Sequence, residues 1–211
     1  MNRRTFHRAG EIERRRDLVN ATLDVIAEQG LRAATVRQIA ARAGVTGGLI
    51  RHYFESKDQM VQEAYRELMR EMQRSVEAAA EAGGLSPRER LRNFIAGNLN
   101  DSVTNARTFA IWAAFIGHVN LDPAFGAIHQ EHYLAFIEKL ESMVLAFQLE
   151  KGEVDPPALL RSKTIAINGL IDGMWLEHSV ARVLFNEGEA AAIVLRSAET
   201  ILGVPEGSLS R

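Results

Sequence analysis

The sequence predicts an all-α fold of about nine helices, and three observations support this prediction. Apolar residues recur every three to four positions along almost the whole chain, which is the period of a helix with one buried face. Runs in which β-branched and polar residues alternate, as they do in strands, are nearly absent. Several segments begin with a side chain that can cap a helix, followed by proline. At 211 residues, the chain is also long enough to bury a substantial core.

The first helix is expected from about residue 13 to residue 29. Its apolar positions form a single stripe, and Gly30 follows as a signal for the C-terminal end of the helix. The stripe consists of Leu18, Ala21, Thr22, Val25 and Ile26.

Two short helices follow, separated by a glycine. Thr35 is placed to cap the first, which ends at Gly44, and Thr46 is placed to cap the second, which ends near Tyr53. Three glycines fall within residues 44–48. Because each glycine costs a helix about 1 kcal/mol relative to alanine, this segment must gain something from a sharp turn and a bare helix start.

The later helices also begin at capping signals. Ser56 starts a long helix that reaches about residue 80. Ser86, Pro87 and Glu89 combine a capping box with proline at the first helical position. Asp-Pro pairs at 122–123 and 155–156 mark two further starts. The remaining helices are expected at about 86–102, 105–118, 122–150, 155–184 and 187–202.

Charge divides the chain into two parts. Residues 1–57 carry 11 Lys and Arg against 6 Asp and Glu, and residues 58–211 carry 14 against 21, so a net +5 precedes a net −7. A basic N-terminal part favours contact with an anion, although an ordinary solvated asymmetry gives the same totals. We therefore expect one domain over residues 1–57 and a second over 58–211. Residues 1–12 are either a disordered basic arm that touches DNA or a segment without a role.

Composition also limits the cellular setting. The chain has no cysteine, which excludes structural disulfides and thiolate metal sites and favours a reducing cytoplasm. The basic, polar N-terminus is unlike a secretory signal, and no uncharged apolar run is long enough for a membrane span. We therefore expect a cytoplasmic protein.

The two short helices and the helix before them have the spacing of a helix-turn-helix, whose second short helix enters the DNA major groove. Gly44 supplies the turn, where positive φ is favoured, and two glycines leave the next helix start bare. Arg51 could bond a guanine through two donors, and the neighbouring polar groups could hold phosphates. The expected DNA contacts are Thr35, Arg37, Thr46, Gly47, Gly48, Arg51, His52, Tyr53 and Lys57. A helical hairpin with a solvated polar face is the alternative.

The segment TVRQIAARAGVTGGLIRHYFESKDQM, residues 35–60, resembles the DNA-binding domain of the TetR family of bacterial transcriptional regulators. The family pattern is matched by Thr35, Ile39-Ala40, Ala43-Gly44-Val45, Tyr53-Phe54 and Lys57. Where the usual triplet is Tyr-His-Phe, this chain has His52-Tyr53-Phe54, which resembles the choline-responsive, BetI-type repressors. The later segments IWAAFIGH and INGLIDGMWLEHSV resemble the same subgroup.

The resemblance implies a ligand-responsive repressor that binds a palindromic operator as a dimer and is released by a small molecule. One recognition helix contacts only a few base pairs, so two copies roughly 34 Å apart are needed for useful affinity. The family forms its dimer through its last two helices, expected here at 155–184 and 187–202. Their apolar faces would be supplied by Leu159, Ile165, Leu170, Ala190, Ile193, Val194 and Ile201.

The helical body offers aromatic and acidic side chains for a cationic effector. An aromatic box beside a carboxylate suits a quaternary ammonium, which has no strong hydrogen-bond donor, and choline or a related cation is therefore the expected effector. The expected effector-binding residues are Trp112, Phe115, Tyr133, Asp172, Trp175 and Glu177. The alternative is that the aromatic residues simply pack in a core and that Asp172 is paired at the dimer interface.

Other functional classes are less favoured. The sequence has no nucleophile motif, phosphate-binding loop or zinc spacing, so we expect neither an enzyme nor a bound metal or cofactor. His129 and His132, with Glu131 between them, could hold a metal only with a third ligand such as His118. The remaining alternative is a helical small-molecule-binding or interaction module without DNA binding, which would show no salt-sensitive affinity for DNA.

Overall fold

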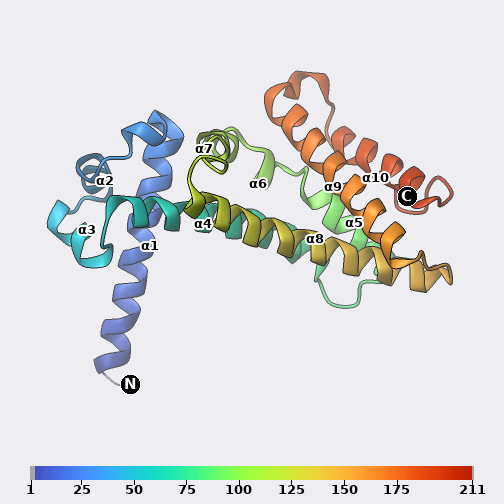
Figure 1. The fold of residues 1–211 in the computed structure, drawn as a ribbon, viewed down its shortest axis with the longest axis horizontal. Helices are drawn as coiled ribbons and strands as arrows, with labels where there is room; N and C mark the ends of the chain where they lie inside the picture. Colours follow the sequence, from blue (N-terminus) through green and yellow to red (C-terminus); the bar gives the residue numbers. More distant parts are fainter. Residues whose placement is uncertain (1–2, 211) are drawn as a thin grey trace. The chain divides into compact units, whose positions relative to one another are not determined.

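A computed structural model describes the backbone of residues 3–210 and, in the first helix, side chains from Gly10 onward. These residues form an all-α fold, as predicted, and contain no strand (Figure 1). None of their helices is long and apolar enough to cross a membrane. The helices are α1 Arg3–Gln29, α2 Val36–Ala43, α3 Gly47–Tyr53, α4 Lys57–Ala80, α5 Pro87–Gly97, α6 Asp101–Thr104, α7 Ala106–Ile116, α8 Pro123–Lys151, α9 Pro157–Val180 and α10 Glu189–Leu202, with 3-10 turns η1 Leu31–Ala33 and η2 Arg182–Leu184.

The chain divides into two compact units. The N-terminal unit comprises Met1–Arg70 and Arg107–Gln130, and the C-terminal unit comprises Glu71–Ala106 and Glu131–Arg211. This division differs from the boundary expected after residue 57, because α4 and α8 each continue from one unit into the other.

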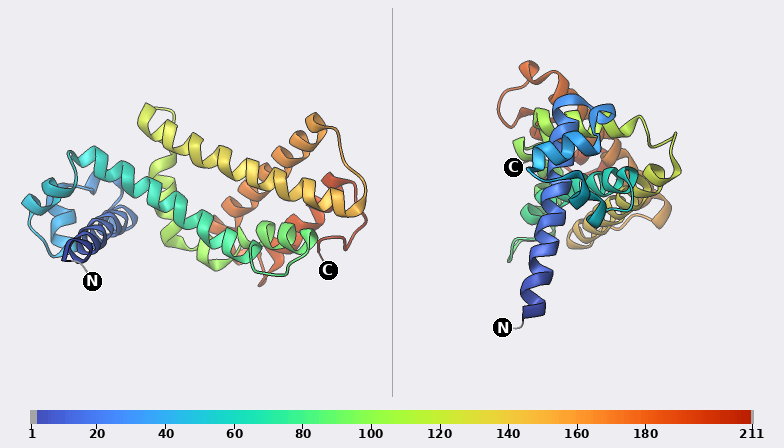
Figure 2. Two further views of the ribbon diagram at one scale, coloured as in Figure 1. Left: turned by 90° about the horizontal axis from the view of Figure 1, so that it is seen from below. Right: turned by 90° about the vertical axis from the view of Figure 1, so that its left-hand side faces the viewer.

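In the N-terminal unit, α1 packs its predicted apolar stripe into the core, where Leu18 and Thr22 are fully buried. The helix begins at Arg3, about ten residues before the expected start. The basic arm expected at residues 1–12 is thus helical in its backbone from residue 3, whereas residues 1 and 2 and the side chains of residues 3–9 lie outside the described part. The α2 helix packs against α1, and α3 packs against α2 (Figures 1 and 2).

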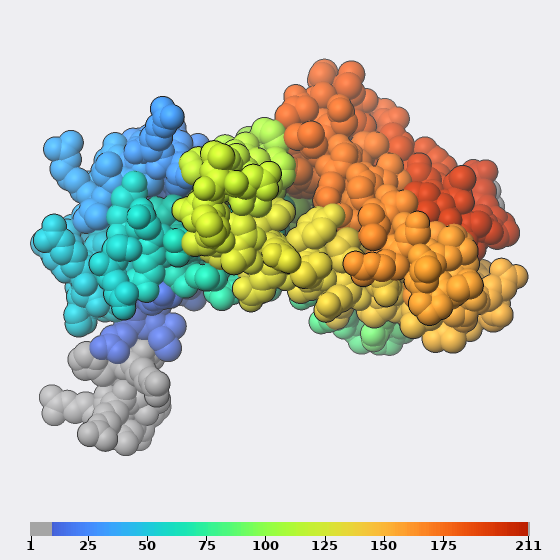
Figure 3. All heavy atoms as spheres, in the orientation of Figure 1, coloured from blue at the N-terminus to red at the C-terminus, as the bar shows by residue number. Residues whose placement is uncertain are grey.

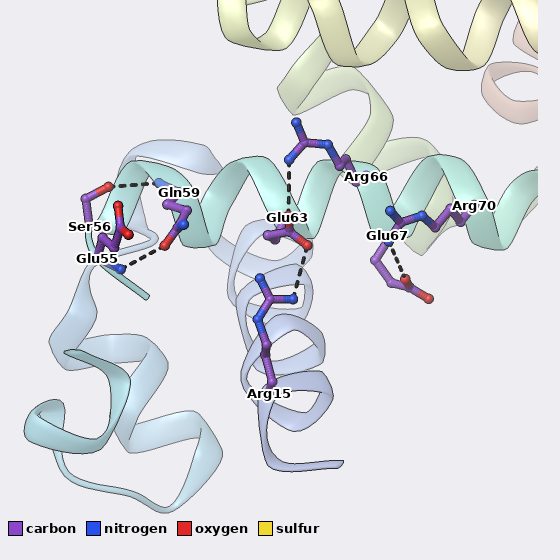
Figure 4. A network of polar contacts seen from close by, with 8 residues as sticks. All are labelled: Arg15, Glu55, Ser56, Gln59, Glu63, Arg66, Glu67 and Arg70. Carbon is purple, nitrogen blue, oxygen red and sulfur yellow. Dashed lines mark hydrogen bonds and ion pairs between the residues drawn. The ribbon is translucent and has the colours of Figure 1, made fainter. Parts of the chain in front are cut away.

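The caps of the N-terminal unit follow the sequence signals. The Thr35 side chain accepts a hydrogen bond from the backbone N–H of Gln38. At the start of α4, the Ser56 hydroxyl accepts from the N–H of Gln59 at 3.0 Å, and the Gln59 side chain accepts from the N–H of Glu55 at 2.8 Å (Figure 4). These bonds satisfy backbone donors that have no partner within the helix.

In the C-terminal unit, the capping box at Ser86 is present, but the helix expected at 86–102 ends at Gly97. Asn100 starts a new turn, α6, by accepting from the N–H of Ser102. The Asp155-Pro156 signal is also realised differently, since α9 begins after Pro156 without a side-chain cap. The Asp155 carboxylate instead pairs with Lys163 at 2.8 Å, which prevents it from capping the helix.

The last helices of the C-terminal unit pack closely. The α10 helix lies against both α9 and α5. Beyond α10, the chain folds back so that Gly207, Leu209 and Ser210 donate backbone N–H groups to the buried Glu199 carboxylate. Burial alone would raise the pKa of Glu199, but these backbone hydrogen bonds outweigh it and lower the pKa. The carboxylate is therefore held charged inside the unit.

Candidate functional site

The α2–turn–α3 segment has the geometry of a helix-turn-helix. Gly44 adopts the left-handed conformation at φ 65°, and its N–H points back to the carbonyls of Ala40 and Ala41. The next residue, Val45, donates to the Ala40 carbonyl at 2.9 Å. Ile50 is buried and fixes one face of α3 against the core of the unit, which leaves the opposite face of α3 at the surface.

The residues predicted to contact DNA lie together on α2, α3 and the start of α4, and they are accessible (Figure 3). Gly47 and Tyr53 are partly exposed. Thr46 occupies the N-cap position of α3, but its side chain makes no capping hydrogen bond. The exposed members are Thr35, Arg37, Thr46, Gly48, Arg51, His52 and Lys57.

The two glycines that open α3 are not required by the fold itself. Neither has a positive φ. A Cβ added at Gly47 would lie 3.6 Å from Val36, and one at Gly48 would lie 3.8 Å from the Thr46 hydroxyl, which are ordinary contacts. Alanine would therefore fit at both positions and would favour the helix, so the packing of the unit does not require a bare start of α3.

Two arginines beside the helix-turn-helix were not among the predicted functional residues. The Arg15 guanidinium lies 4.9 Å from the centre of the Phe54 ring, which follows α3, and its Nη1 is 3.2 Å from Glu63 on α4 (Figure 4). Arg42, in the last turn of α2, forms an ion pair with Glu28 of α1. Charge alone would have suggested DNA contacts for both, and only the tertiary structure shows that they join helices.

In the C-terminal unit, two of the predicted effector-binding residues meet through a third residue that the sequence did not single out. The side-chain amide of Asn168 donates to the Tyr133 hydroxyl at 2.9 Å and to the Asp172 carboxylate at 3.0 Å. Asn168 is almost completely buried, whereas Tyr133 and Asp172 are exposed. Trp175 is buried one turn further along α9, where its Nε1–H donates to the Val103 carbonyl.

The environment of Asp172 disfavours its charge. Although the residue as a whole keeps solvent-accessible surface, desolvation of its carboxyl group raises the pKa, and the hydrogen bond from Asn168 only partly opposes this effect. A carboxylate that gives up part of its hydration gains more from a cationic partner than a fully solvated one does.

The remaining predicted effector residues are placed elsewhere. Phe115 is fully buried in the N-terminal unit, with its ring centre 4.6 Å from that of Tyr65. Trp112, in the same unit, stacks with Phe109 at 6.4 Å. Glu177 follows Asp172 by five residues, which turns it roughly 140° around α9 and away from the Asp172 face. Phe115 therefore has a packing role in this structure, while an effector contact by Glu177 stays a prediction.

A cavity of about 650 Å³ also lies in the C-terminal unit, and none of the predicted effector residues lines it. It is bounded by the end of α5, the start of α6, η2 and the start of α10. Its polar lining includes Asn100, Asp101, His178, Arg182, Asn186 and Glu187.

The two histidines considered as metal ligands have other partners. His129 lies 2.9 Å from the Tyr65 hydroxyl. Burial lowers the pKa of His129 and raises that of Tyr65 to about 12, so burial favours the uncharged form of both side chains. His132 lies 3.0 Å from the Gln73 side chain. Among the described side chains, no group of three or more potential ligands could hold a metal ion.

Comparison with known proteins identifies both parts of the chain. Residues 18–64 match the model of the bacterial regulatory proteins of the tetR family, and residues 87–203 match that of the BetI-type transcriptional repressor C-terminal domain. The HTH-type transcriptional regulator BetI of Serratia proteamaculans is 33% identical over 181 residues, covering 85% of this chain and 88% of the relative.

Solved structures agree with this match. A transcriptional regulator from Pseudomonas aeruginosa PAO1 superimposes with a TM-score of 0.81 at 27% identity, covering 90% of this chain and 91% of that one. A transcriptional regulator from Saccharomonospora viridis, solved in complex with choline, has the same fold with a TM-score of 0.69 at 18% identity, covering 90% of this chain and 96% of that one.

Proposed function

We propose that the chain, which belongs to the TetR family of transcriptional regulators and has a BetI-type C-terminal domain, acts in the cytoplasm as a homodimer on a palindromic operator and is released by choline or another quaternary ammonium ion. It is a DNA-binding repressor and not an enzyme. We further propose that the exposed residues of α2, α3 and the start of α4 contact the DNA. The accessible, bare start of α3 is the observation that supports these DNA contacts.

Dimerisation through α9 and α10 is supported by the apolar side chains that α9 leaves exposed. Ile165 is 47% exposed and Val180 59% exposed, and Leu159 and Leu176 are similarly accessible. Burying such side chains against a second copy is worth about 25 cal/mol per Å² of apolar surface. Ala190 and Val194, by contrast, are buried within the protomer, so α10 must offer other residues, such as the partly exposed Ile193 and Ile201.

The cationic effector is supported by the cluster of Tyr133, Asn168 and Asp172. It joins an aromatic ring and a partly desolvated carboxylate through a buried amide. A ring face and a carboxylate are the groups that attract a quaternary ammonium ion. The choline complex of the Saccharomonospora viridis regulator, which has the same fold, also favours this class of effector.

The test is binding of the purified protein to the DNA upstream of its own gene at two salt concentrations, with and without choline. We expect tight binding that weakens steeply with salt and is reduced by choline. Salt-sensitive binding that is indifferent to choline would contradict the effector proposal alone. Binding to that DNA no tighter than to a random duplex would contradict operator recognition at that site.

Asp172→Asn tests the site within the same assay. We expect choline to bind about tenfold more weakly to the variant, because the cation loses its counter-charge, while operator affinity stays unchanged. The raised pKa gives a second readout: choline affinity of the parent should fall as pH is lowered through that pKa, because protonation removes the charge. The variant should show no such fall, and equal choline affinity in both proteins would remove Asp172 from the site.

A further inference from the structure

Three helices of the N-terminal unit meet at one carboxylate, that of Asp24 on α1. Its Oδ1 accepts from Arg107 Nη2 on α7 at 2.7 Å. Its Oδ2 lies 3.9 Å from Arg42 Nε on α2, and Arg42 is also held by Glu28, one turn further along α1. Figure 1 labels the three helices that this carboxylate joins.

The two arginines occupy particular points in the chain. Arg42 lies two residues before Gly44, so it marks the end of α2 that leads into the turn and α3. Arg107 is in the first turn of α7 and is the residue at which the chain returns from the C-terminal unit to the N-terminal unit. Asp24 therefore connects the chain arriving from the body to the helix that precedes the DNA-contacting helix.

These ion pairs contribute little to the stability of the unit. The side chains of Arg42, Asp24 and Arg107 are 37%, 39% and 43% exposed. Exposed pairs of this kind contribute about 0–1 kcal/mol each. Contacts of that strength can be exchanged easily between two arrangements of similar energy, which is what a ligand-responsive protein needs between its ligand site and its DNA contacts.

We propose that Asp24 is a positioning residue for DNA binding, through which Arg107 at the start of α7 sets the placement of α2 and hence of α3. Arg42 and Arg107 share one carboxylate, so a change at either arginine alters the hold on the other. If α7 shifts and Arg107 moves away, Asp24 keeps only its ion pair with Arg42. The contact that holds the end of α2 against α1 then changes.

This role can be distinguished from simple electrostatics by the sign of one substitution. Replacing an aspartate of the N-terminal unit with asparagine makes the unit more positive, so electrostatics alone predicts tighter binding to any DNA. Loss of a positioning contact predicts weaker binding to the operator only. Asp17→Asn is the matched control, because Asp17 pairs with Arg14 within α1 and is also exposed.

The experiment compares Asp24→Asn with Asp17→Asn on a duplex selected from a random pool by the parent protein and on an unselected duplex. We expect Asp24→Asn to bind the selected duplex about three- to tenfold more weakly than the parent, without loss on the unselected duplex. Asp17→Asn should bind both at least as tightly as the parent does. If Asp24→Asn behaves like Asp17→Asn on both duplexes, the proposal is wrong.

A double-mutant cycle with Arg107→Gln tests the connection itself. Long-range charge effects of the two substitutions add, whereas effects transmitted through a shared contact do not. We expect Arg107→Gln to weaken binding to the selected duplex in the parent but to add little in the Asp24→Asn background. Arg107→Lys, which keeps the charge, should restore most of the affinity in the parent background. Independent effects of Asp24→Asn and Arg107→Gln would overturn the proposal.

Discussion

The proposed DNA-contacting segment, residues 35–57, and the proposed effector cluster of Tyr133, Asn168 and Asp172 differ in how the chain assembles them. The proposed DNA contacts fall within residues 35–57, where a cap at Thr35, a left-handed glycine at Gly44 and a second cap at Ser56 define the geometry locally. The effector cluster joins Tyr133 of α8 to Asn168 of α9, 35 residues apart, and it exists only because those two helices pack together. A local motif can be recognised from its residues in order, whereas a site built across helices depends on the register of their packing.

The two regions also use burial in opposite ways. Most of the proposed DNA contacts are exposed. The effector cluster instead depends on a buried amide, and its carboxylate has a pKa raised by desolvation. Substitutions in the first region should therefore act mainly on DNA binding, while those in the second should affect packing and ligand binding together.

The largest expected effect concerns a different region, the exposed face of α9, and tests whether that face forms the dimer interface. Ile165→Asp replaces a 47%-exposed apolar side chain with a charge, so the folded protomer should lose little stability. If α9 forms the dimer interface, the buried charge should dissociate the dimer and reduce operator affinity by about a hundredfold or more, because each protomer retains one half-site. Sedimentation and operator titration would measure both effects.

Leu149→Asp provides the control for that substitution. Leu149 is 62% exposed on α8, outside the proposed interface, so its variant should remain dimeric and bind the operator normally. A dimeric Ile165→Asp variant would show that α9 does not form the interface.

The next largest effect separates base recognition from phosphate contact within the DNA-contacting segment. Arg51→Ala should cost about 1–3 kcal/mol of operator binding and relax the preference at one base pair, since a bidentate contact to guanine would be lost. Lys57→Ala should weaken binding to all sequences and lower the slope of log affinity against log salt by about one unit. Titration of a set of single-base operator variants at several salt concentrations distinguishes the two. An unchanged base preference in Arg51→Ala would exclude Arg51 as a base contact.

The sequence predicted the fold well because its signals were local. The capping box at Ser86 and the stripe on α1 appear as expected, since each depends on residues within one or two helical turns. The errors arose where tertiary partners competed with a local signal. Asp155 lies before a proline and could cap α9, but Lys163 and Gln148 engage its carboxylate instead.

The effector residues were harder to predict for the same reason. Helical spacing put Trp112 and Phe115 on one face, but it could not show that Phe115 packs against Tyr65 and Phe125. The sequence did not indicate a role for Asn168, because its role depends on the hydrogen bond to the Tyr133 hydroxyl on another helix. The role of Asp24 was equally invisible, since its partners lie on two other helices.

The smallest expected effect is that of Gly48→Ala, which should change stability and operator affinity in opposite directions. An added Cβ would meet only the Thr46 hydroxyl, at 3.8 Å, and alanine favours a helix by about 1 kcal/mol over glycine, so the variant should be slightly more stable. Its operator affinity should nevertheless fall several-fold, because the methyl group would hold the start of α3 away from the DNA. Ala78→Gly, exposed on α4 in the C-terminal unit, should show the reverse: lower stability and normal operator binding. Thermal unfolding and operator titration of both variants would test this. If Gly48→Ala gains stability without losing affinity, the bare start of α3 has no role in close approach to DNA.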